Sequence, residues 1–587
     1  MSTYNAPLSD YLFLLEHVLD YEGSIASLPA YEEAPLDVVR AVLEEGSKIA
    51  QDVLAPINRS GDEEGCQWQD GRVATPEGFA EAYATYREGG WPGLVAAPEF
   101  GGQGLPRVVG LIQREVVSGA NTAFGTYLGL SQSAYSAIAA HGTEELKQYL
   151  LPPLVEGRWM GTMCLTEPHC GTDLGLIRTR AERSDGGMFR ITGTKIFVTA
   201  GEHDMADNIV HLVLARLPDG PAGTKGLSLF AVPKYLPSGD GQWEQRNRIE
   251  CTGIEHKMGI KASATATLAF DGAQGWLVGV EHQGLRAMFT MMNSSRLGVA
   301  VQSVGLAEAA LQMAHDYAHE RRQGRAVGMA DAPVSIIHHA DVRRNLLSAR
   351  AFVEGARALW LWAGIQLDEQ VAHPDPVRRE QCDGYLALLT PVLKSFFSDR
   401  SFEATNAAMQ VFGGHGYIRE TGIEQYVRDG RIIPLYEGTN GIQALDLVSR
   451  KINKDGGRMV TAFFELVERE IRRMRPSRPQ FSDALSHALN HLRDATDFIV
   501  DRAESDPHAH GATGHDYLQL FGLVAMGFAW SKIVSASVGL HDASASEIAA
   551  SKLEVAEFFF MRVLAESSYR YQLVKAGSAP IMALQKI

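Results

Sequence analysis

The stretch MFRITGTKIFVTAG (residues 188–201) interrupts a chain that is otherwise helical in character. Apolar and β-branched residues alternate with polar ones in it, which is the period of a half-buried strand and not of a helix. Similar short runs recur between residues 160 and 285, separated by the turn dipeptides Asp185-Gly186, Asp219-Gly220 and Asp240-Gly241. The pattern predicts an antiparallel β domain of seven or eight strands.

Helical spacing dominates on both sides of this β domain. The N-terminal side is rich in alanine and is broken by the Gly- and Pro-rich loop GWPGLVAAPEFGGQGLP (90–106). On the C-terminal side, a glycine-rich break KINKDGGRM (451–459) precedes a last stretch with about four more helices. The predicted class is α+β, with an N-terminal extension helix (1–35), an N-terminal helical domain (36–158), a middle β domain (159–285), a C-terminal helical bundle (286–453) and an extra helical module (459–587).

Bulk composition excludes several classes of protein. The 587 residues carry a formal charge of −16, which argues against a general binder of nucleic acid or anionic membranes. The N-terminus lacks the basic region of a signal peptide, and the apolar run FGLVAMGFAW (521–530) is too short to span a bilayer. Five scattered cysteines without clustered histidines argue against a zinc site or disulfide framework, so no metal and a cytoplasmic location are expected.

Two stretches in the predicted β domain could bind a flat ring. CLTEPHCGTD (164–173) describes an irregular loop rich in hydrogen-bond donors, although a plain β-domain turn explains it equally well. In ITGTKIFVTAG (191–201), Phe197 and Thr199 are two residues apart and share one face of a strand, so they could stack on and hydrogen-bond a heterocycle. For this segment alone, a half-buried strand is the commoner explanation.

Two stretches in the predicted bundle could bind phosphate. In MQVFGGHGYIRE (409–420), glycines would let backbone amides approach an anion, but many such loops only connect helices. AHERRQGR (318–325) ends a helix with arginines that are usually solvated, although Arg321 could reach a pyrophosphate.

Glu437 is a carboxylate in the apolar stretch IIPLYEGTNGIQ (432–443). Burial disfavours the charged form of a carboxylate, so an unpaired one in such a setting needs a reason. It is either a helix-start carboxylate or a base held in a dry cleft.

Taken together, these stretches resemble the acyl-CoA dehydrogenase family over about residues 40–450. The resemblance rests on PEFGGQGL, LTEPHCGTD, GTKIFVTAG, NSSRLGVAVQSVGLA, YAHERR, QVFGGHGY and LYEGT, all in the family's order. It implies a helical domain, a middle β domain and a helical bundle, with FAD between the last two. The cofactor-binding residues that it implies are Met163, Leu165, Thr166, Thr172, Phe197 and Thr199 along the flavin, and Arg321, His338, Gln410, Gly413, Gly414 and Thr439 for the dinucleotide.

The resemblance also implies the substrate site and the oligomer. The substrate-binding residues would be Thr172, Asn293, Arg296 and Gly438, although many relatives have aspartate at the position of Asn293. Glu437 would be the base that removes the α-proton of an acyl-CoA, with its pKa raised by a dry cleft and its backbone amide holding the thioester oxygen. The alternative base position of some relatives is Ser295 here, which cannot serve. Because the Arg321 group would grip the FAD of a neighbouring subunit, at least a dimer is implied.

About 130 residues extend past the usual end of the family, as in its longer bacterial members. The favoured function is oxidation of a fatty acyl-CoA, with an electron-transfer flavoprotein as acceptor and a homodimer because the module could block a tetramer. The alternatives are a 3-(methylthio)propanoyl-CoA dehydrogenase, an acyl-CoA oxidase and a DNA-associated flavoprotein. The last depends only on the basic run REIRRMRPSR (469–478).

Overall fold

The computed structural model describes residues 4–237, 243–329, 333–540 and 543–584 of the chain. These residues form two compact units. We call them the sheet unit (Lys48–Leu105 and Ala120–Gly298) and the bundle unit (Met1–Ser47, Pro106–Gly119 and Val299–Ile587).

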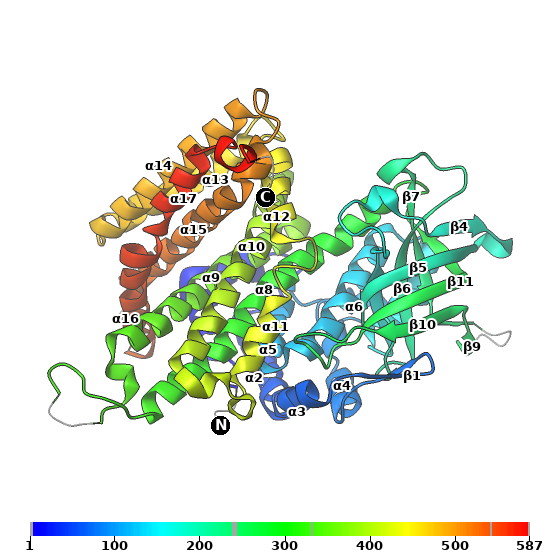
Figure 1. Cartoon of the computed structure of the whole chain (residues 1–587), viewed down its shortest axis with the longest axis horizontal. Coiled ribbons are helices and arrows are strands. Elements are labelled where there is room, and N and C mark those ends of the chain that lie inside the picture. The colour runs from blue at the N-terminus through cyan, green and yellow to red at the C-terminus, as the bar shows by residue number, and fades with distance from the viewer. Residues whose placement is uncertain (1–3, 238–242, 330–332, 541–542, 585–587) are drawn as a thin grey trace. The chain divides into compact units, whose positions relative to one another are not determined.

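The sheet unit is built around a seven-stranded sheet of order β10-β11-β5-β4-β6-β3, in which β7 pairs with both β11 and β6 and so closes a ring of strands (Figure 1). Most pairs are antiparallel, as predicted, but β3 pairs with β6 in parallel. A parallel pair needs a long crossover, and the chain between these two strands supplies it. The strands are β3 (Trp159–Cys164), β4 (Arg180–Arg183), β5 (Phe189–Thr199), β6 (Asn208–Arg216), β7 (Leu227–Pro233), β10 (Ile249–Ile254) and β11 (Thr265–Val278), and two separate hairpins pair β1 (Gln67–Gln69) with β2 (Arg72–Ala74) and β8 (Tyr235–Leu236) with β9 (Gln245–Arg246).

Turn residues end these strands where the sequence predicts it. Gly186 adopts a positive φ of 68°, which glycine tolerates without steric cost, and Gly220 closes a turn by donating from its N–H to the Leu217 carbonyl at 3.1 Å. The predicted Asp240-Gly241 turn lies outside the described residues.

The sheet unit also contains helices, and two of them have N-cap residues whose side chains accept hydrogen bonds from the first turn. The Asn121 side chain accepts from the Phe124 N–H at 3.0 Å at the start of α6, and the Thr143 hydroxyl accepts from the Leu146 N–H at 3.2 Å at the start of α7. α6 packs against β3. The helices are α3 (Pro56–Glu64), α4 (Phe79–Glu88), α6 (Thr122–His141) and α7 (Glu144–Val155); α8 (Gly284–Glu320) begins in this unit and continues in the other.

The bundle unit is helical, and the C-terminal module is part of it. Its helices are α1 (Leu8–Phe13), α2 (Leu36–Ile49), α5 (Arg107–Ala120), α9 (Ala340–Ala372), α10 (Pro376–Val411), α11 (Ile423–Arg431) and α12 (Asn440–Asp446), followed by the module's α13 (Arg458–Met474), α14 (Pro479–Arg502), α15 (Ala509–Ser537), α16 (Ala543–Phe558), α17 (Glu566–Lys575) and α18 (Ala579–Met582). Gly456 and Gly457, both with positive φ, break the chain before α13, as the glycine-rich sequence predicts. The helices α13 to α18 are more than the four that the sequence predicts for this module.

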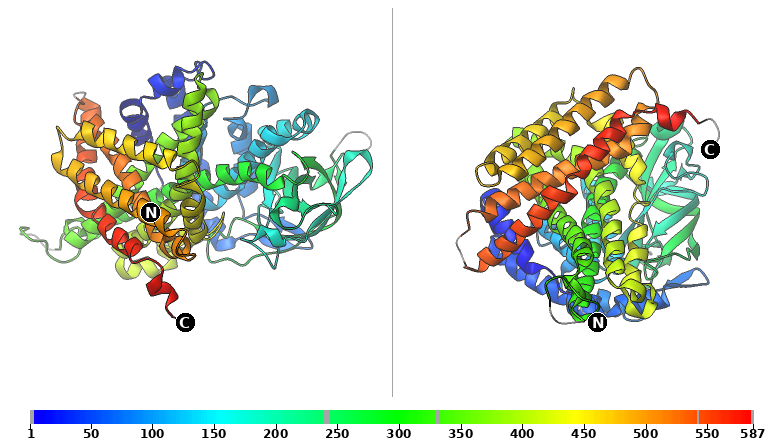
Figure 2. Two further views of the ribbon diagram at one scale, coloured as in Figure 1. Left: turned by 90° about the horizontal axis from the view of Figure 1, so that it is seen from above. Right: turned by 60° about the vertical axis from the view of Figure 1, so that its left-hand side comes forward.

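Helix α15 joins the module to the long helices α9 and α10 (Figure 2). Its Trp530 is fully buried and donates from the indole N–H to the Ala351 carbonyl at 3.1 Å. A Cβ at Gly355 would lie 2.3 Å from that indole nitrogen, so α9 has glycine where the ring packs. Two helices, α8 and α15, are long and apolar enough to cross a membrane, but 89% and 83% of their apolar windows are buried inside the protein, as in core helices.

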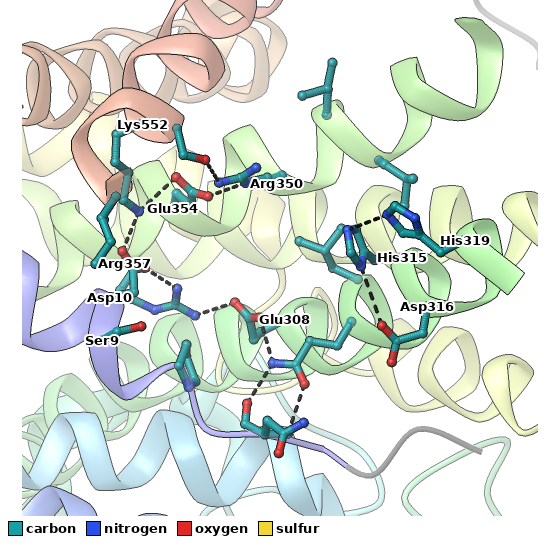
Figure 3. A pocket seen from close by; sticks show the side chains of 18 of the residues that line it. Ser9, Asp10, Glu308, His315, Asp316, His319, Arg350, Glu354, Arg357 and Lys552 are labelled. Atoms are coloured by element: carbon teal, nitrogen blue, oxygen red, sulfur yellow. Dashed lines mark hydrogen bonds and ion pairs between the residues drawn. The ribbon is translucent and has the colours of Figure 1, made fainter. Parts of the chain in front are cut away.

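A buried ion network ties the N-terminal helix and the module to the bundle (Figure 3). The Arg357 guanidinium pairs with Glu115 at 2.6 Å, Asp10 at 2.6 Å and Glu308 at 2.7 Å. Lys552 of α16 pairs with Asp10 of α1 and with Glu354 of α9. The network borders a pocket of about 720 Å³.

Candidate active site

Glu437 lies in the short connection between α11 and α12 and has a strained backbone. Its φ is +57°, a region that residues other than glycine avoid because Cβ approaches the carbonyl oxygen. Gly438 follows with φ +84°. Such strain costs on the order of 1–2 kcal/mol and persists only where surrounding contacts enforce it. Two consecutive left-handed residues turn the chain sharply at the carboxylate.

A buried lysine and two amides enforce this turn. The Lys394 ammonium on α10 is fully buried and donates to the Gly438 carbonyl at 3.0 Å and to the Asn440 side-chain oxygen at 2.9 Å. The Gln443 amide donates to the Glu437 and Gly438 carbonyls, both at 3.2 Å. The backbone of Glu437 is therefore held from α10 and from α12.

Sequence reasoning missed Lys394, Asn440 and Gln443. The one available signal was a lysine inside the apolar run LLTPVLKSFF of α10, because a lysine in an apolar setting must find buried acceptors.

A charged group and a phenol lie near Glu437. The Tyr436 hydroxyl donates to the Gln302 side-chain oxygen on α8 at 2.6 Å, and burial raises the pKa of Tyr436. Burial lowers the pKa of Arg114 on α5, and the nearby Tyr436 and Glu437 partly oppose that effect. Glu437 thus has a cation and a phenol as electrostatic neighbours within the bundle unit.

In the sheet unit, the loop 164–173 is held by a buried ion pair. The Lys195 ammonium on β5 is fully buried and donates to the Leu165 carbonyl and to the Glu167 carboxylate, each at 2.9 Å. Glu167 also accepts from the Arg178 N–H and from the Thr179 N–H and hydroxyl. Burial favours the protonated form of Glu167, but the charge of Lys195 and these bonds outweigh it and lower its pKa. Sequence reasoning missed Glu167 and Lys195 as well.

Glu167, His169 and Cys170 are the one group of three metal-ligand side chains found within 4.8 Å of one another among the described residues. A cation already neutralises Glu167, because Lys195 donates to it, and the backbone and hydroxyl donors use its remaining capacity. We therefore assign this cluster to the anchoring of the loop and not to a metal.

Phe197 and Thr199 lie beside this loop on β5. A bulge between Lys195 and Val198 coincides with φ +56° at Phe197, and the ring is 59% exposed. Thr199 is half-buried, and the Ile196 N–H donates to the Thr166 carbonyl at 2.9 Å, which brings loop and strand together. An exposed aromatic ring on the strand that is bonded to the Thr166 loop fits a flat polar ring such as a flavin.

The other predicted positions divide between the two units. In the sheet unit, Met163 and Leu165 are half-buried, Thr172 and Asn293 are exposed and Arg296 is buried. In the bundle unit, Gly438 is half-buried and Thr439 is exposed, next to Glu437.

The remaining positions lie in segments of the bundle unit whose apolar residues, among them Ala318, Ile336 and Val411, share one buried cluster: Arg321, His338, Gln410, Gly413 and Gly414. Tyr317 stacks on Phe412 at 4.1 Å, and the Ile336 N–H donates to the Arg321 carbonyl at 2.8 Å. A Cβ at Gly413 or Gly414 would meet nothing within 4 Å, so their backbone is open to a ligand. An open glycine backbone suits a phosphate-bearing dinucleotide.

Family models cover nearly the whole chain. The acyl-CoA dehydrogenase N-terminal domain matches residues 39–158, the middle domain 162–273 and the C-terminal domain 282–452. The model described as acetyl-CoA dehydrogenase C-terminal like matches residues 459–585.

Similar proteins include a 3-methylmercaptopropionyl-CoA dehydrogenase of Ruegeria pomeroyi, 41% identical over 97% of this chain and 98% of the relative. A broad-specificity linear acyl-CoA dehydrogenase of Mycobacterium tuberculosis is 36% identical over 78% of this chain and 76% of the relative. Among solved structures, Caenorhabditis elegans ACDH-11 in complex with C11-CoA superposes with a TM-score of 0.80 over 100% of this chain and 96% of that one. Its identity of 19% makes that likeness one of fold.

Proposed function

Because the chain belongs to the acyl-CoA dehydrogenase family of FAD-dependent oxidoreductases, we propose that it oxidises a short acyl-CoA, with 3-(methylthio)propanoyl-CoA favoured, to the trans-2-enoyl-CoA. The Ruegeria pomeroyi relative, which matches 97% of this chain, supports that substrate. The observation that carries the reaction is the strained backbone of Glu437, held by the buried Lys394. The fatty acyl-CoA that the sequence favoured stays a prediction, and the linear acyl-CoA relative supports it as the second candidate.

Glu437 is the proposed catalytic base. Its carboxylate removes the α-proton of the thioester while hydride leaves the β-carbon, so that two C–H bonds break and one C=C bond forms. The chemistry that FAD supplies when bound is acceptance of that hydride. The Glu437 N–H donates to the thioester oxygen, where negative charge develops. Lys394 and Gln443 keep this amide and the carboxylate in place through the bonds to residues 437 and 438.

The cofactor and substrate residues keep the roles that the family motifs imply. The flavin would lie along the Thr166 loop and under Phe197, with Thr199 beside it, and the coenzyme A part would meet Asn293 and Arg296. The exposed Phe197 ring and the open backbone at Gly413 support these roles. The acceptor would be an electron-transfer flavoprotein, and the enzyme would be a cytoplasmic homodimer.

The DNA-associated alternative has little support. In the basic run 469–478, which includes the end of α13, Arg472 pairs with Glu468 at 3.8 Å, Arg473 with Glu470 at 3.9 Å and Arg475 with Asp483 at 2.8 Å. Paired arginines do not form a phosphate track.

Anaerobic flavin bleaching tests the proposal. The purified enzyme is mixed with 3-(methylthio)propanoyl-, butanoyl-, octanoyl- or hexadecanoyl-CoA and followed at the flavin absorbance band. We expect fastest bleaching with the first, and loss of bleaching by at least about a thousandfold in Glu437→Gln. Glu380→Gln, at an exposed position of α10, is the matched control and should bleach like wild type. Equal bleaching by Glu437→Gln would refute the base, and fastest bleaching with hexadecanoyl-CoA would refute the substrate.

A further inference from the structure

Helices α5 and α8 approach each other closely next to the catalytic loop. A Cβ at Gly305 of α8 would lie 2.4 Å from the Glu115 carbonyl of α5, so the two backbones are in contact there. Arg114 precedes Glu115, and Gln302 lies about one turn before Gly305 on α8. The hydrogen bond from the Tyr436 hydroxyl to Gln302 brings the residue before Glu437 to the same place.

Gln302 presents a buried donor at this place. The side chain is 4% exposed, and its oxygen accepts from Tyr436 at 2.6 Å. Its amide nitrogen, Nε2, has no hydrogen-bond partner among the described residues. Buried polar groups are nearly always paired because leaving a donor unpaired costs free energy, so this amide calls for an acceptor.

Arg114 presents a second donor group to the same region. Its guanidinium is half-buried and makes no hydrogen bond to a side chain or carbonyl in the described part of the chain, in contrast to Arg357, which contacts three carboxylates. Glu115, its neighbour on α5, accepts hydrogen bonds from the Arg357 guanidinium and from the Trp360 indole N–H. The electrostatic neighbours of Arg114 are the Tyr436 phenol, whose raised pKa keeps it neutral, and the Glu437 carboxyl group. A positive group with free hydrogen-bond donors therefore lies beside the base.

We propose that Arg114 and Gln302 form a polar end of the acyl-binding site and select acyl groups that carry a hydrogen-bond acceptor beyond the β-carbon. The inference rests on the proposed function, in which Glu437 meets the α-carbon. Donors next to that carboxylate then meet atoms a few bonds farther along the acyl chain. A thioether sulfur or a terminal carboxylate satisfies them, whereas a hydrocarbon chain of the same length leaves both donors unpaired.

Binding to a variant that does not turn over tests this selection. Titration calorimetry on flavin-loaded Glu437→Gln compares pentanoyl-, 3-(methylthio)propanoyl- and glutaryl-CoA, which differ in the acceptor and little in length. We expect glutaryl-CoA to bind at least about tenfold, and the thioether at least about threefold, more tightly than pentanoyl-CoA, since a charge-assisted bond is stronger than one to a weak acceptor. The ratio of the affinities for glutaryl-CoA and 3-(methylthio)propanoyl-CoA identifies which acceptor the site prefers.

Substitutions at the two donors complete the test. In the same Glu437→Gln variant, adding Arg114→Met or Gln302→Leu should bring the dissociation constants for the two polar acyl-CoAs to within about twofold of that for pentanoyl-CoA. Adding Arg114→Lys should keep part of the preference. Arg107→Met, an exposed arginine at the start of α5, is the matched control and should leave the preference unchanged. Flavin content and Tm confirm that each variant is folded.

The outcomes separate the two proposals. No binding of any acyl-CoA to the parent variant would overturn the proposed function. Binding without preference for polar acyl groups, or a preference that survives Arg114→Met and Gln302→Leu, would overturn only the polar end.

Discussion

Lys552→Met should loosen the C-terminal module from the rest of the bundle unit. The ammonium is buried, and it joins three helices, because it pairs with Asp10 of α1 and with Glu354 of α9 at 2.8 Å. Methionine has a similar length, so the main change is loss of a charge between two carboxylates.

The size of the stability loss depends on the ion pairs that each carboxylate retains without Lys552. Removing one partner of a buried ion pair costs about 3–5 kcal/mol because the other charge stays uncompensated. Asp10 keeps Arg357 at 2.6 Å and Glu354 keeps Arg350 at 2.5 Å, which places the expected loss near the lower limit, about 3 kcal/mol. For a unit of roughly 350 residues, unfolding entropies of about 2 cal/mol/K per residue convert this into a Tm lower by about 4 °C.

The loss should also depend on pH. Burial would raise the pKa of Asp10, but Lys552 and Arg357 outweigh it and the pKa is lowered. A carboxyl group with a lowered pKa in the folded state stabilises the protein above its unfolded pKa of about 3.9 and loses this contribution as pH falls. The Tm difference between wild type and Lys552→Met should therefore shrink as the pH falls below about 3.9 toward the lowered pKa of Asp10.

Thermal unfolding followed by near-UV circular dichroism checks both points. Lys532→Met is the matched control in the same module, because that lysine is 3.7 Å from Glu470 and more exposed; it should lower Tm by less than about 1 °C. Adding Glu354→Leu to Lys552→Met removes one of the two carboxylates that lose the lysine charge, and because Arg350 is partly exposed to water, it should recover part of the loss. An unchanged Tm in Lys552→Met, or a further loss in the double variant, would refute the reasoning.

Three further perturbations test the site and the sheet unit. Lys394→Met releases the turn at the base and should lower kcat about a hundredfold with little change in flavin content, measured by steady-state kinetics with an artificial electron acceptor. Lys195→Met leaves a buried carboxylate in the 164–173 loop, so we expect about tenfold weaker FAD retention on dialysis and faster proteolysis of the loop; wild-type retention would contradict this. Burial, with the charge of Lys234, lowers the pKa of His203 and of His211 to about 3 each. Because the unfolded chain binds protons below pH 6.5 and these histidines do not, stability should fall as pH drops from 6.5, by up to about 1.4 kcal/mol per pH unit for each histidine. Urea unfolding of His211→Asn should show a pH slope of the unfolding free energy that is smaller than that of wild type by up to about 1.4 kcal/mol per pH unit between pH 6 and 4.

The sequence by itself determined the order of the elements and pointed to Glu437 as the proposed base. Alternation in 188–201, Asp-Gly turns and glycine-rich breaks are local signals, because a strand's period and a turn's φ depend on adjacent residues. Glu437 could also be recognised from the sequence alone, because a carboxylate within an apolar run is unusual and needs a functional or structural reason.

Only the tertiary structure decided what holds these residues. Lys394 lies 44 positions before Gly438, Lys195 lies 28 after Glu167, and Gln302 lies 134 before Tyr436. The parallel pairing of β3 with β6 and the bulge that exposes Phe197 likewise depend on partners from distant strands. Which lysine is buried against which carbonyl is selected by packing of whole helices and strands, and the periodicity of any one segment carries no information about that choice.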